Sequence, residues 1–199
     1  AVKLDFANGI RSMMRQDPDI ILVGEIRDHP TAEMAFRAAM TGHQVYSTLH
    51  TNSAIGAIPR LLDIGILPDI MAGNIIGIVA QRLERILCKE CKSPYQPDAP
   101  ERQLLGVPAH QNAPLYRAAG CKACNHQGYK GRMAIMELIK MDHDLDDLVS
   151  RRASTRQIRE AALAKGFRPL ATDGIRRILQ GVTSLAEVGR VVDMTDRLG

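Results

Sequence analysis

The sequence predicts an α/β fold that is followed by a small metal-binding insertion and a helical carboxyl-terminal part. A β-branched run, Ile20–Val23, is typical of a buried strand in a parallel sheet, and a helix and a second strand follow it. Two Cys-x-x-Cys pairs frame a loop-rich stretch with little periodicity. The carboxyl-terminal third has helical patterns. We therefore place segment boundaries at 1–87, 88–132 and 133–199.

The first segment is expected to alternate helices and strands. Apolar spacing predicts a helix over Phe6–Arg15 that ends before the strand Ile20–Val23. Asp28 can cap the next helix, which ends near Gly42, a residue suited to the left-handed end of a helix. A second strand is predicted over Gln44–Leu49, so the order implies a right-handed α/β unit. Two further helices are predicted, over Ser53–Leu62 and Pro68–Leu87.

After the insertion, the sequence predicts one strand and then helices. The strand is expected over Met133–Leu138. Ser154-x-x-Gln157 and Ser184-x-x-Glu187 are capping boxes, in which each side chain satisfies a free backbone N–H of the first helical turn.

Composition excludes some classes of protein. The most hydrophobic stretch, Ile70–Ala80, is too short to span a bilayer, and we interpret it as a buried helix. The net charge of +4 and the absence of Trp do not by themselves indicate a nucleic-acid-binding surface. Ala1–Phe6 has no signal-peptide pattern and no initiator Met, so we expect a piece excised from a longer protein.

An acidic residue, Glu25, follows the first predicted strand. Ligands of open α/β sheets bind at the carboxyl ends of the strands, where a carboxylate can hold hydrated Mg²⁺ or orient a water that attacks a phosphate. The pattern also fits a charged strand end that only faces solvent.

Two histidines, His43 and His50, flank the second predicted strand. A histidine at a strand end can donate a hydrogen bond to phosphate. The alternative is a pair of ordinary, partly exposed histidines.

Four cysteines form two Cys-x-x-Cys pairs, which is the ligand spacing of tetrahedral Zn²⁺. Four thiolates fill the coordination shell and leave no open position, so the pattern favours a structural zinc over a catalytic one. The other alternative is a set of unligated thiols. The expected ligands are Cys88, Cys91, Cys121 and Cys124.

These segments together resemble the secretion ATPase superfamily, and more narrowly the assembly ATPases of type II secretion systems and type IV pili. The resemblance rests on Arg-Gln-Asp-Pro-Asp, Gly-Glu-Ile-Arg-Asp and Ser-Thr-Leu-His-Thr-Asn. The Ala80–Leu83 segment, the tetracysteine insertion and Gly128–Arg132 also match, so it covers essentially the whole chain. It implies the carboxyl-terminal part of a RecA-like P-loop ATPase domain, with an inserted tetracysteine zinc module and a helical carboxyl-terminal subdomain.

The resemblance also implies roles for individual residues. Glu25 matches the Walker B glutamate that supports Mg²⁺ and water. His50 matches the His-box histidine near the γ-phosphate of ATP, and His43 is the other histidine of that box. The four cysteines match the zinc ligands. Basic positions near nucleotide or subunit contacts are matched by Arg11, Arg15, Arg27 and Arg132.

Members of this family form homo-hexamers that hydrolyse ATP between subunits. The resemblance therefore implies a protein at the cytoplasmic face of the bacterial inner membrane, with inner-membrane platform components as partners and no nucleic acid. The sequence contains no Gly-x-x-x-x-Gly-Lys-[Ser/Thr] motif, so the β- and γ-phosphates have no cradle here. We expect this chain alone to be inactive as an ATPase.

Three alternatives stay open to different degrees. Pilus retraction ATPases share the Walker B and His boxes but lack the tetracysteine insertion, so the cysteines disfavour them. DNA-uptake or DNA-transfer ATPases are close relatives that the sequence separates poorly. A zinc-ribbon nucleic-acid-binding module, from a different class, would need basic and aromatic residues clustered around the cysteine pairs.

Overall fold

The computed structural model describes residues 5–194 and divides into two compact units. Unit 1 comprises Ala1–Ala80 and Leu138–Phe167, and unit 2 comprises Gln81–Glu137 and Arg168–Gly199. These units are groups of residues that pack together. The boundaries predicted above follow changes in composition along the sequence, and they stay a prediction. Most of the stretch Ala1–Phe6 lies outside the described residues.

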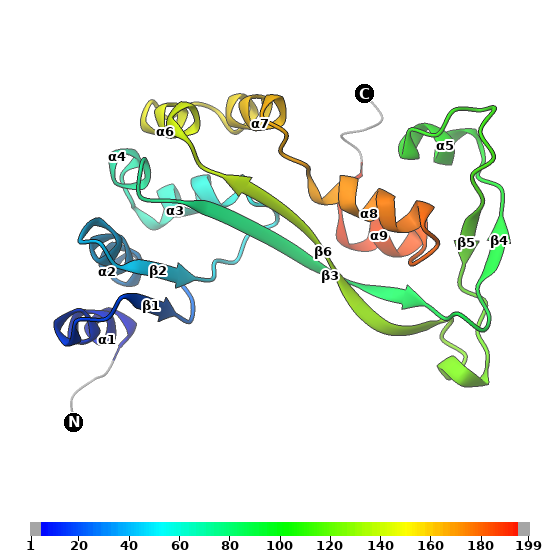
Figure 1. Cartoon of the computed structure of the whole chain (residues 1–199), viewed down its shortest axis with the longest axis horizontal. Helices are drawn as coiled ribbons and strands as arrows, with labels where there is room; N and C mark the ends of the chain where they lie inside the picture. Colours follow the sequence, from blue (N-terminus) through cyan, green and yellow to red (C-terminus); the bar gives the residue numbers. More distant parts are fainter. Residues whose placement is uncertain (1–4, 195–199) are drawn as a thin grey trace. The chain divides into compact units, whose positions relative to one another are not determined.

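Unit 1 begins with a helix, a strand, a helix and a second strand, as the sequence predicts (Figure 1). Helix α1 (Phe6–Met13) continues into the short helix η1 (Met14–Gln16) before strand β1 (Ile20–Val23). Helix α2 (His29–Met40) leads to strand β2 (Gln44–Ser47), which pairs with β1 in parallel. The predicted β–α–β order and strand positions are therefore confirmed.

Local chemistry sets the bounds of α2. The Asp28 side chain accepts the N–H of Thr31 and caps the first turn, with Pro30 at the start of the helix. At the other end, Gly42 has a φ of 98°, a left-handed conformation that favours glycine. The buried side of α2 packs with α1 and β1 in a small core: Ala7, Ile10, Ile21, Val23, Met34 and Ala38.

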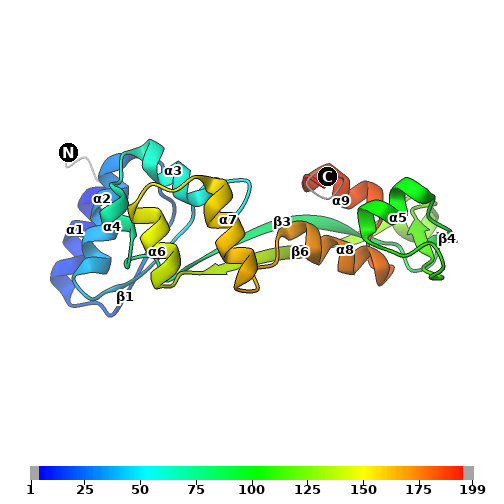
Figure 2. The same cartoon turned by 90° about the horizontal axis from the view of Figure 1, so that it is seen from above.

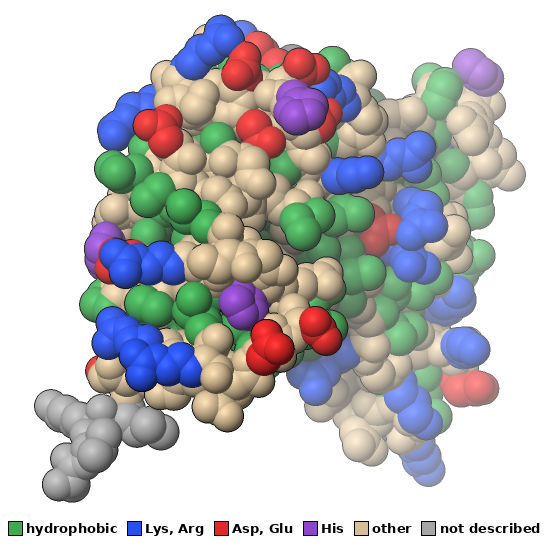
Figure 3. Space-filling view, turned by 60° about the vertical axis from the view of Figure 1, so that its left-hand side comes forward, with side chains coloured by type: hydrophobic (Ala, Val, Ile, Leu, Met, Phe, Trp, Pro, Cys, Tyr) green, Lys and Arg blue, Asp and Glu red, His purple; other side chains and the backbone are tan. Residues whose placement is uncertain are grey.

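The parallel pairing of β1 is as predicted, but only one of its faces is buried, so the prediction of a buried strand holds for alternate residues only. Ile21 and Val23 are buried, whereas Ile20 and Leu22 are 60% and 74% exposed. The reason is that α1 and α2 both pack against the buried side. Tyr46 of β2 is also exposed, and hydrophobic side chains lie open on the near face of Figure 3.

The larger core of unit 1 is made by short helices: α3 (Ala57–Ile64), α4 (Pro68–Met71), α6 (His143–Ser150) and α7 (Thr155–Ala164). The Ser154 capping box at the start of α7 is confirmed, because Ser154 and Gln157 bond to each other's backbone N–H. The largest side chains of this core are Phe36, Ile58, Leu61, Met71, Ile139, Leu145 and Ile158.

The predicted helix over Pro68–Leu87 is wrong. The structure has four helical residues in α4 and then strand β3 (Gly77–Leu87), which pairs with strand β6 (Tyr129–Lys140). The apolar spacing fits a helix, but β-branched residues and Gly77 favour an extended chain, and cross-strand bonds to β6 decide the outcome. Ile76 is 74% exposed, so Ile70–Ala80 is not a buried helix either.

The predicted strand Met133–Leu138 lies within β6 and is confirmed. The insertion between β3 and β6 is more regular than its composition indicates. It contains β4 (Ser93–Tyr95), α5 (Ala99–Leu105), β5 (Leu115–Arg117) and η2 (Lys122–Cys124), with β4 and β5 antiparallel. Tertiary contacts stabilise these short elements, which are too brief to show periodicity in the sequence.

Two helices complete unit 2, α8 (Leu170–Leu179) and α9 (Leu185–Val191), and they lie side by side in both views (Figure 2). Only half of the second predicted capping box forms. Ser184 accepts the N–H of Glu187, but the Glu187 carboxylate binds Arg85 and Arg190 instead of the Ser184 backbone. Across residues 5–194, no helix has the length and apolar character needed to cross a membrane.

Candidate functional site

The first candidate site lies at the carboxyl ends of β1 and β2. Glu25 is the second residue after β1, and His50 is the third residue after β2. Because the two strands are parallel, their carboxyl ends meet at one edge of the sheet. The sequence-predicted pair is brought together there: His50 Nε2 lies 3.1 Å from Glu25 Oε2.

A second side chain, Arg27, contacts the same carboxylate oxygen. Arg27 Nε donates to Glu25 Oε2 over 2.5 Å. The Arg27 guanidinium lowers the pKa of Glu25, partial burial opposes this effect, and His50 adds to it. Glu25 therefore carries a negative charge at neutral pH, which suits a group that binds a hydrated cation or orients a water molecule.

One residue of the second motif bonds to the backbone on both sides of Glu25. The Thr48 hydroxyl donates to the carbonyl oxygen of Gly24 over 2.7 Å. The Ile26 N–H donates to the carbonyl oxygen of Thr48 over 2.9 Å. Sequence reasoning missed these two bonds, because they join segments 24 and 22 residues apart and no local pattern encodes them.

The structure does not bring His43 to this edge. His43 precedes β2, and its Nδ1 lies 3.0 Å from the carbonyl oxygen of Ala38 and 3.1 Å from Thr41 Oγ1. It therefore sits at the amino end of β2, a strand of four residues that spans roughly 13 Å. In this conformation His43 contacts the end of α2, whereas His50 contacts Glu25.

Of the four predicted arginines, the structure places only Arg27 in contact with Glu25. Arg27 contacts Glu25, as described. Arg11 lies on α1, where its guanidinium contacts Asn8 and the sulfur of Met34, and Arg15 is an exposed residue of η1. Arg132 is exposed on β6 and belongs to unit 2.

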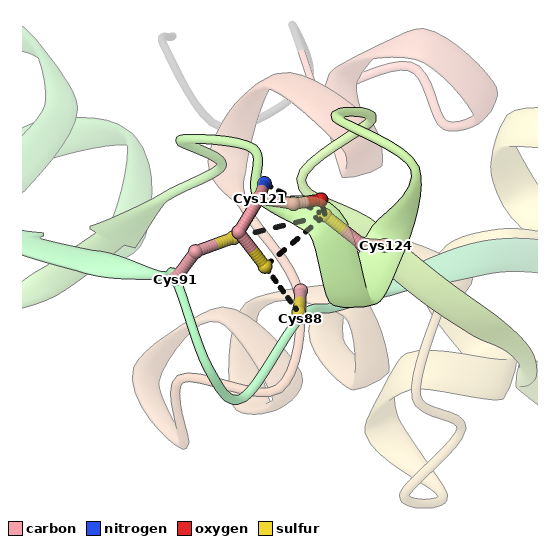
Figure 4. Close-up of side chains that lie close together, drawn as sticks. All are labelled: Cys88, Cys91, Cys121 and Cys124. Atoms are coloured by element: carbon pink, nitrogen blue, oxygen red, sulfur yellow. Dashed lines mark hydrogen bonds between the residues drawn. The ribbon is translucent and has the colours of Figure 1, made fainter.

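The second candidate site is the cysteine cluster of unit 2. Cys88 and Cys91 follow β3, Cys121 precedes η2 and Cys124 ends it. The four sulfur atoms point toward one another (Figure 4). All four sulfurs lie within 4.8 Å of one another, and three pairs are 3.8–3.9 Å apart. A tetrahedral ion with Zn–S bonds of about 2.3 Å would place sulfurs about 3.8 Å apart. The cluster fits such an ion.

Backbone donors surround these sulfurs. The N–H groups of Cys121 and Gly128 donate to Cys124 Sγ over 3.2 Å, and the N–H of Gly120 donates to Cys91 Sγ over 3.3 Å. Both glycines have φ values in the left-handed region. A side chain at Gly128 would also lie 2.5 Å from the Cβ of Ala118, so the turn needs glycine.

The thiols differ in their readiness to ionise. Burial opposes ionisation of Cys124, but the N–H donors of Cys121 and Gly128 prevail and lower its pKa to about 6. Burial raises the pKa of Cys91 to about 11. The thiolate is the form that binds metal, so the N–H donors prepare Cys124 for ligation.

The turn between α8 and α9 holds the cysteine cluster to the rest of unit 2. Lys92 Nζ donates to the carbonyl oxygen of Gly181, and Leu87 N–H donates to that of Val182. Lys92 also lies over the Tyr116 ring, 4.4 Å from its centroid, and Tyr129 Oη lies 2.7 Å from Ser184 Oγ. The bonds from Lys92 and Tyr129 to this turn and the start of α9 join residues 89 and 55 positions apart in the chain.

Sequence reasoning missed two buried glutamates, Glu84 on β3 and Glu187 on α9. Glu187 is fully buried and receives the Arg85 and Arg190 side chains at 2.6 and 2.8 Å. Glu84 is also fully buried, but neither of its carboxylate oxygens has a hydrogen-bond partner. Burial, followed by the charges of Glu187 and Asp173, raises the pKa of Glu84 to about 7.

Comparison with known proteins identifies the family of this chain. Residues 1–190 match the family described as Type II/IV secretion system protein. The type II secretion system protein E of Pseudomonas aeruginosa is 47% identical over 190 residues, which are 96% of this chain and 38% of that protein. The type IV pilus assembly ATPase TfpB of Acinetobacter baylyi is 48% identical over 197 residues, 98% of this chain and 34% of that protein.

The fold has a solved counterpart. A crystal structure of the pilus retraction motor PilT with bound ADP superposes with a TM-score of 0.67 at 25% identity, over 96% of this chain and 45% of that one. The chain thus spans less than half the length of each of these three proteins. On the strength of the match over residues 1–190, the chain belongs to the type II/IV secretion system protein family.

Proposed function

We propose that this chain is the carboxyl-terminal part of a RecA-like motor ATPase that powers type II protein secretion or type IV pilus assembly. The contact between Glu25 and His50 at the carboxyl edge of a parallel strand pair carries the proposal. Relatives of the two system types are about equally similar, 47% and 48% identical, so the proposal covers both systems.

In this proposal Glu25 acts on the water and Mg²⁺ that accompany ATP, and His50 acts on the phosphate. The ionised Glu25 carboxylate accepts hydrogen bonds and so orients water. The His50 imidazole lies on the same edge and can donate a hydrogen bond, from a nitrogen not engaged with Glu25, to the charge that develops on the transferred phosphate. Mg²⁺, when bound with ATP, neutralises part of that charge. Phosphate-cradling residues must come from another part of the polypeptide, because this sequence has no P-loop motif.

The cysteine cluster is proposed to hold a structural Zn²⁺. Four sulfurs with tetrahedral spacing and backbone N–H donors support it, and thiolates are the ligands that zinc prefers. With four protein ligands there is no open position for a substrate, so the ion would stabilise unit 2 and take no part in hydrolysis.

The assembled protein is proposed to be a homo-hexamer at the cytoplasmic face of the inner membrane, working with inner-membrane platform components and without nucleic acid. Support comes from family membership. The arginines outside the Glu25–His50 contact fit contacts to nucleotide or to the next subunit: Arg11, Arg15 and Arg132 are all exposed. His43, at the other end of β2, would need a different role from that of His50.

The full-length protein that contains this sequence tests the proposal. Glu25→Gln keeps the shape of the side chain but removes its charge, so ATP binding should persist while hydrolysis falls by at least about 100-fold. His50→Ala should also slow turnover. Glu33→Gln, at a half-buried glutamate of α2 that pairs with Arg37 in a salt bridge, is the matched control and should keep normal turnover. Normal hydrolysis by both Glu25→Gln and His50→Ala would refute the assignment of the site.

A further inference from the structure

We propose that Thr48 is a positioning residue that holds Glu25 against His50. The inference rests on the proposed function, since it concerns the same site, and it adds a residue that acts through the backbone of Glu25. Its argument is the pair of hydrogen bonds that Thr48 makes on either side of Glu25.

The two bonds fix the backbone on both sides of position 25. The Thr48 hydroxyl holds the carbonyl of Gly24 at 2.7 Å, and the Thr48 carbonyl holds the N–H of Ile26 at 2.9 Å. With residues 24 and 26 both attached to residue 48, the backbone of Glu25 has little freedom to rotate. Its carboxylate is thereby directed toward the segment that carries His50.

The position of Thr48 explains why such a brace is needed. The strand pairing of β1 and β2 ends at Val23 and Ser47, one residue before Gly24 and Thr48. Beyond that point the chain has no regular ladder to hold it, and Gly24 adds backbone freedom. Thr48 supplies two further cross-links between the segments, one of them from its side chain.

The Glu25 contacts are sensitive to such positioning. Both Arg27 and His50 reach the same oxygen, Oε2, at 2.5 and 3.1 Å. A change in the backbone at residue 25 would therefore alter both contacts together. Since misplacement of a reacting group by about 1 Å can cost about 100-fold in rate, loss of the brace should affect the chemical step.

The test uses a pair of substitutions that differ in one hydroxyl. Thr48→Val keeps the branched shape and removes the hydroxyl, whereas Thr48→Ser keeps the hydroxyl. In the full-length protein, Thr48→Val should lower kcat about 10-fold or more and leave the KM for ATP within about twofold. Thr48→Ser should restore kcat to within about threefold. Thr155→Val, the same change at an exposed threonine that begins α7, is the control and should not alter kcat.

A second measurement needs no activity and suits the 199-residue chain. Hydrogen exchange at the Ile26 amide should be faster in Thr48→Val than in Thr48→Ser or the wild type. The reason is that the segment around Thr48, whose carbonyl accepts the Ile26 N–H, is less firmly held without the hydroxyl. If Thr48→Val fails to fold, Thr48→Ala replaces it in both measurements. Unchanged exchange at Ile26 would show that the Thr48 hydroxyl does not hold the backbone around Glu25, and would overturn the inference.

The outcomes separate this inference from the proposed function. Glu25→Gln and Thr48→Val are both made in the full-length protein and assayed under the same conditions. If Glu25→Gln abolishes hydrolysis but Thr48→Val turns over normally, the positioning role is wrong and the proposed site stands. If Glu25→Gln hydrolyses ATP normally, the site itself is wrong. A fall in melting temperature for Thr48→Val with unchanged kcat would show a structural role only, and would also overturn the inference.

Discussion

Replacing the buried Glu84 with glutamine should stabilise unit 2 at high pH and have little effect at low pH. The Glu84 side chain is fully buried, and both of its oxygens are without hydrogen-bond partners. The charged groups that act on it come from both helices packed above β3: Asp173 and Arg177 of α8, and Glu187 and Arg190 of α9. The two acids and the burial outweigh the arginines, which makes the ionised form of Glu84 costly.

The size and sign of the effect follow from the pKa of Glu84, which rises from 4.5 to about 7 on folding. The folded state therefore keeps a proton that the unfolded state loses above pH 4.5. Stability falls as the pH rises from about 4.5 to about 7 and then levels off. At about 1.4 kcal/mol per pH unit, the full penalty is roughly 3 kcal/mol. Glutamine does not titrate, so Glu84→Gln should recover most of this above pH 7.

Urea unfolding at pH 5, 6.5 and 8 measures the effect. Three of the four tyrosines lie in unit 2 and there is no tryptophan, so tyrosine absorbance mainly reports that unit: Tyr95, Tyr116 and Tyr129. The stability gained by Glu84→Gln should grow from about 1 kcal/mol at pH 5 to roughly 3 kcal/mol at pH 8. Glu90→Gln, at an exposed position in the same unit, should change stability by about 0.5 kcal/mol or less at every pH.

An effect of Glu84→Gln that is the same at pH 5 and pH 8 would refute this reasoning. It would mean that Glu84 has the same pKa in the folded and unfolded states. A loss of stability at pH 8 would mean that the ionised carboxylate has a favourable partner.

Three further predictions concern metal, acid and assembly. Freshly purified protein should contain about one zinc per chain, and elemental analysis that finds no zinc would contradict this. Cys121→Ser or a strong chelator should make unit 2 melt before unit 1. The pKa of Glu187 is about 2, because Arg85 and Arg190 outweigh its burial. Stability should therefore be lost as the pH falls from about 4.5 to about 2. Glu187→Gln should flatten that loss in an acid titration followed by circular dichroism. The 199-residue chain alone should show no measurable ATP turnover and should sediment as a monomer or weak oligomer at micromolar concentration; a stable hexamer would show that this part carries the ring contacts by itself.

Features encoded by neighbouring residues were predictable from the sequence. The strand Ile20–Val23 was found because β-branched residues ended by glycine are a local signal. The cysteine pairs were found because metal ligation requires a fixed spacing, and the structure brings all four sulfurs together. Glu25 and His50 were each placed at the end of a predicted strand from local sequence, and the structure brings the two together.

Features that depend on distant partners were not predictable. The apolar spacing in Pro68–Leu87 fits a helix, but pairing with β6, more than 40 residues later, makes most of it a strand. Glu84 appears in the sequence as an ordinary charged residue, and only the packing of α8 and α9 buries it. The Thr48 brace likewise joins positions 24 residues apart through a side chain.

The turn between α8 and α9 has a consequence for how the protein is made. Bonds from this turn and from α9 reach back across 89 to 102 residues, from Gly181 to Lys92 and from Glu187 to Arg85. A ribosome adding about 5–20 residues per second needs roughly 5–20 s to synthesise that interval. Cys124 is synthesised 57 residues before Gly181, so all four thiols exist before their supporting turn does. Early capture of zinc by the four thiols would keep this nascent segment compact until α9 arrives and completes unit 2.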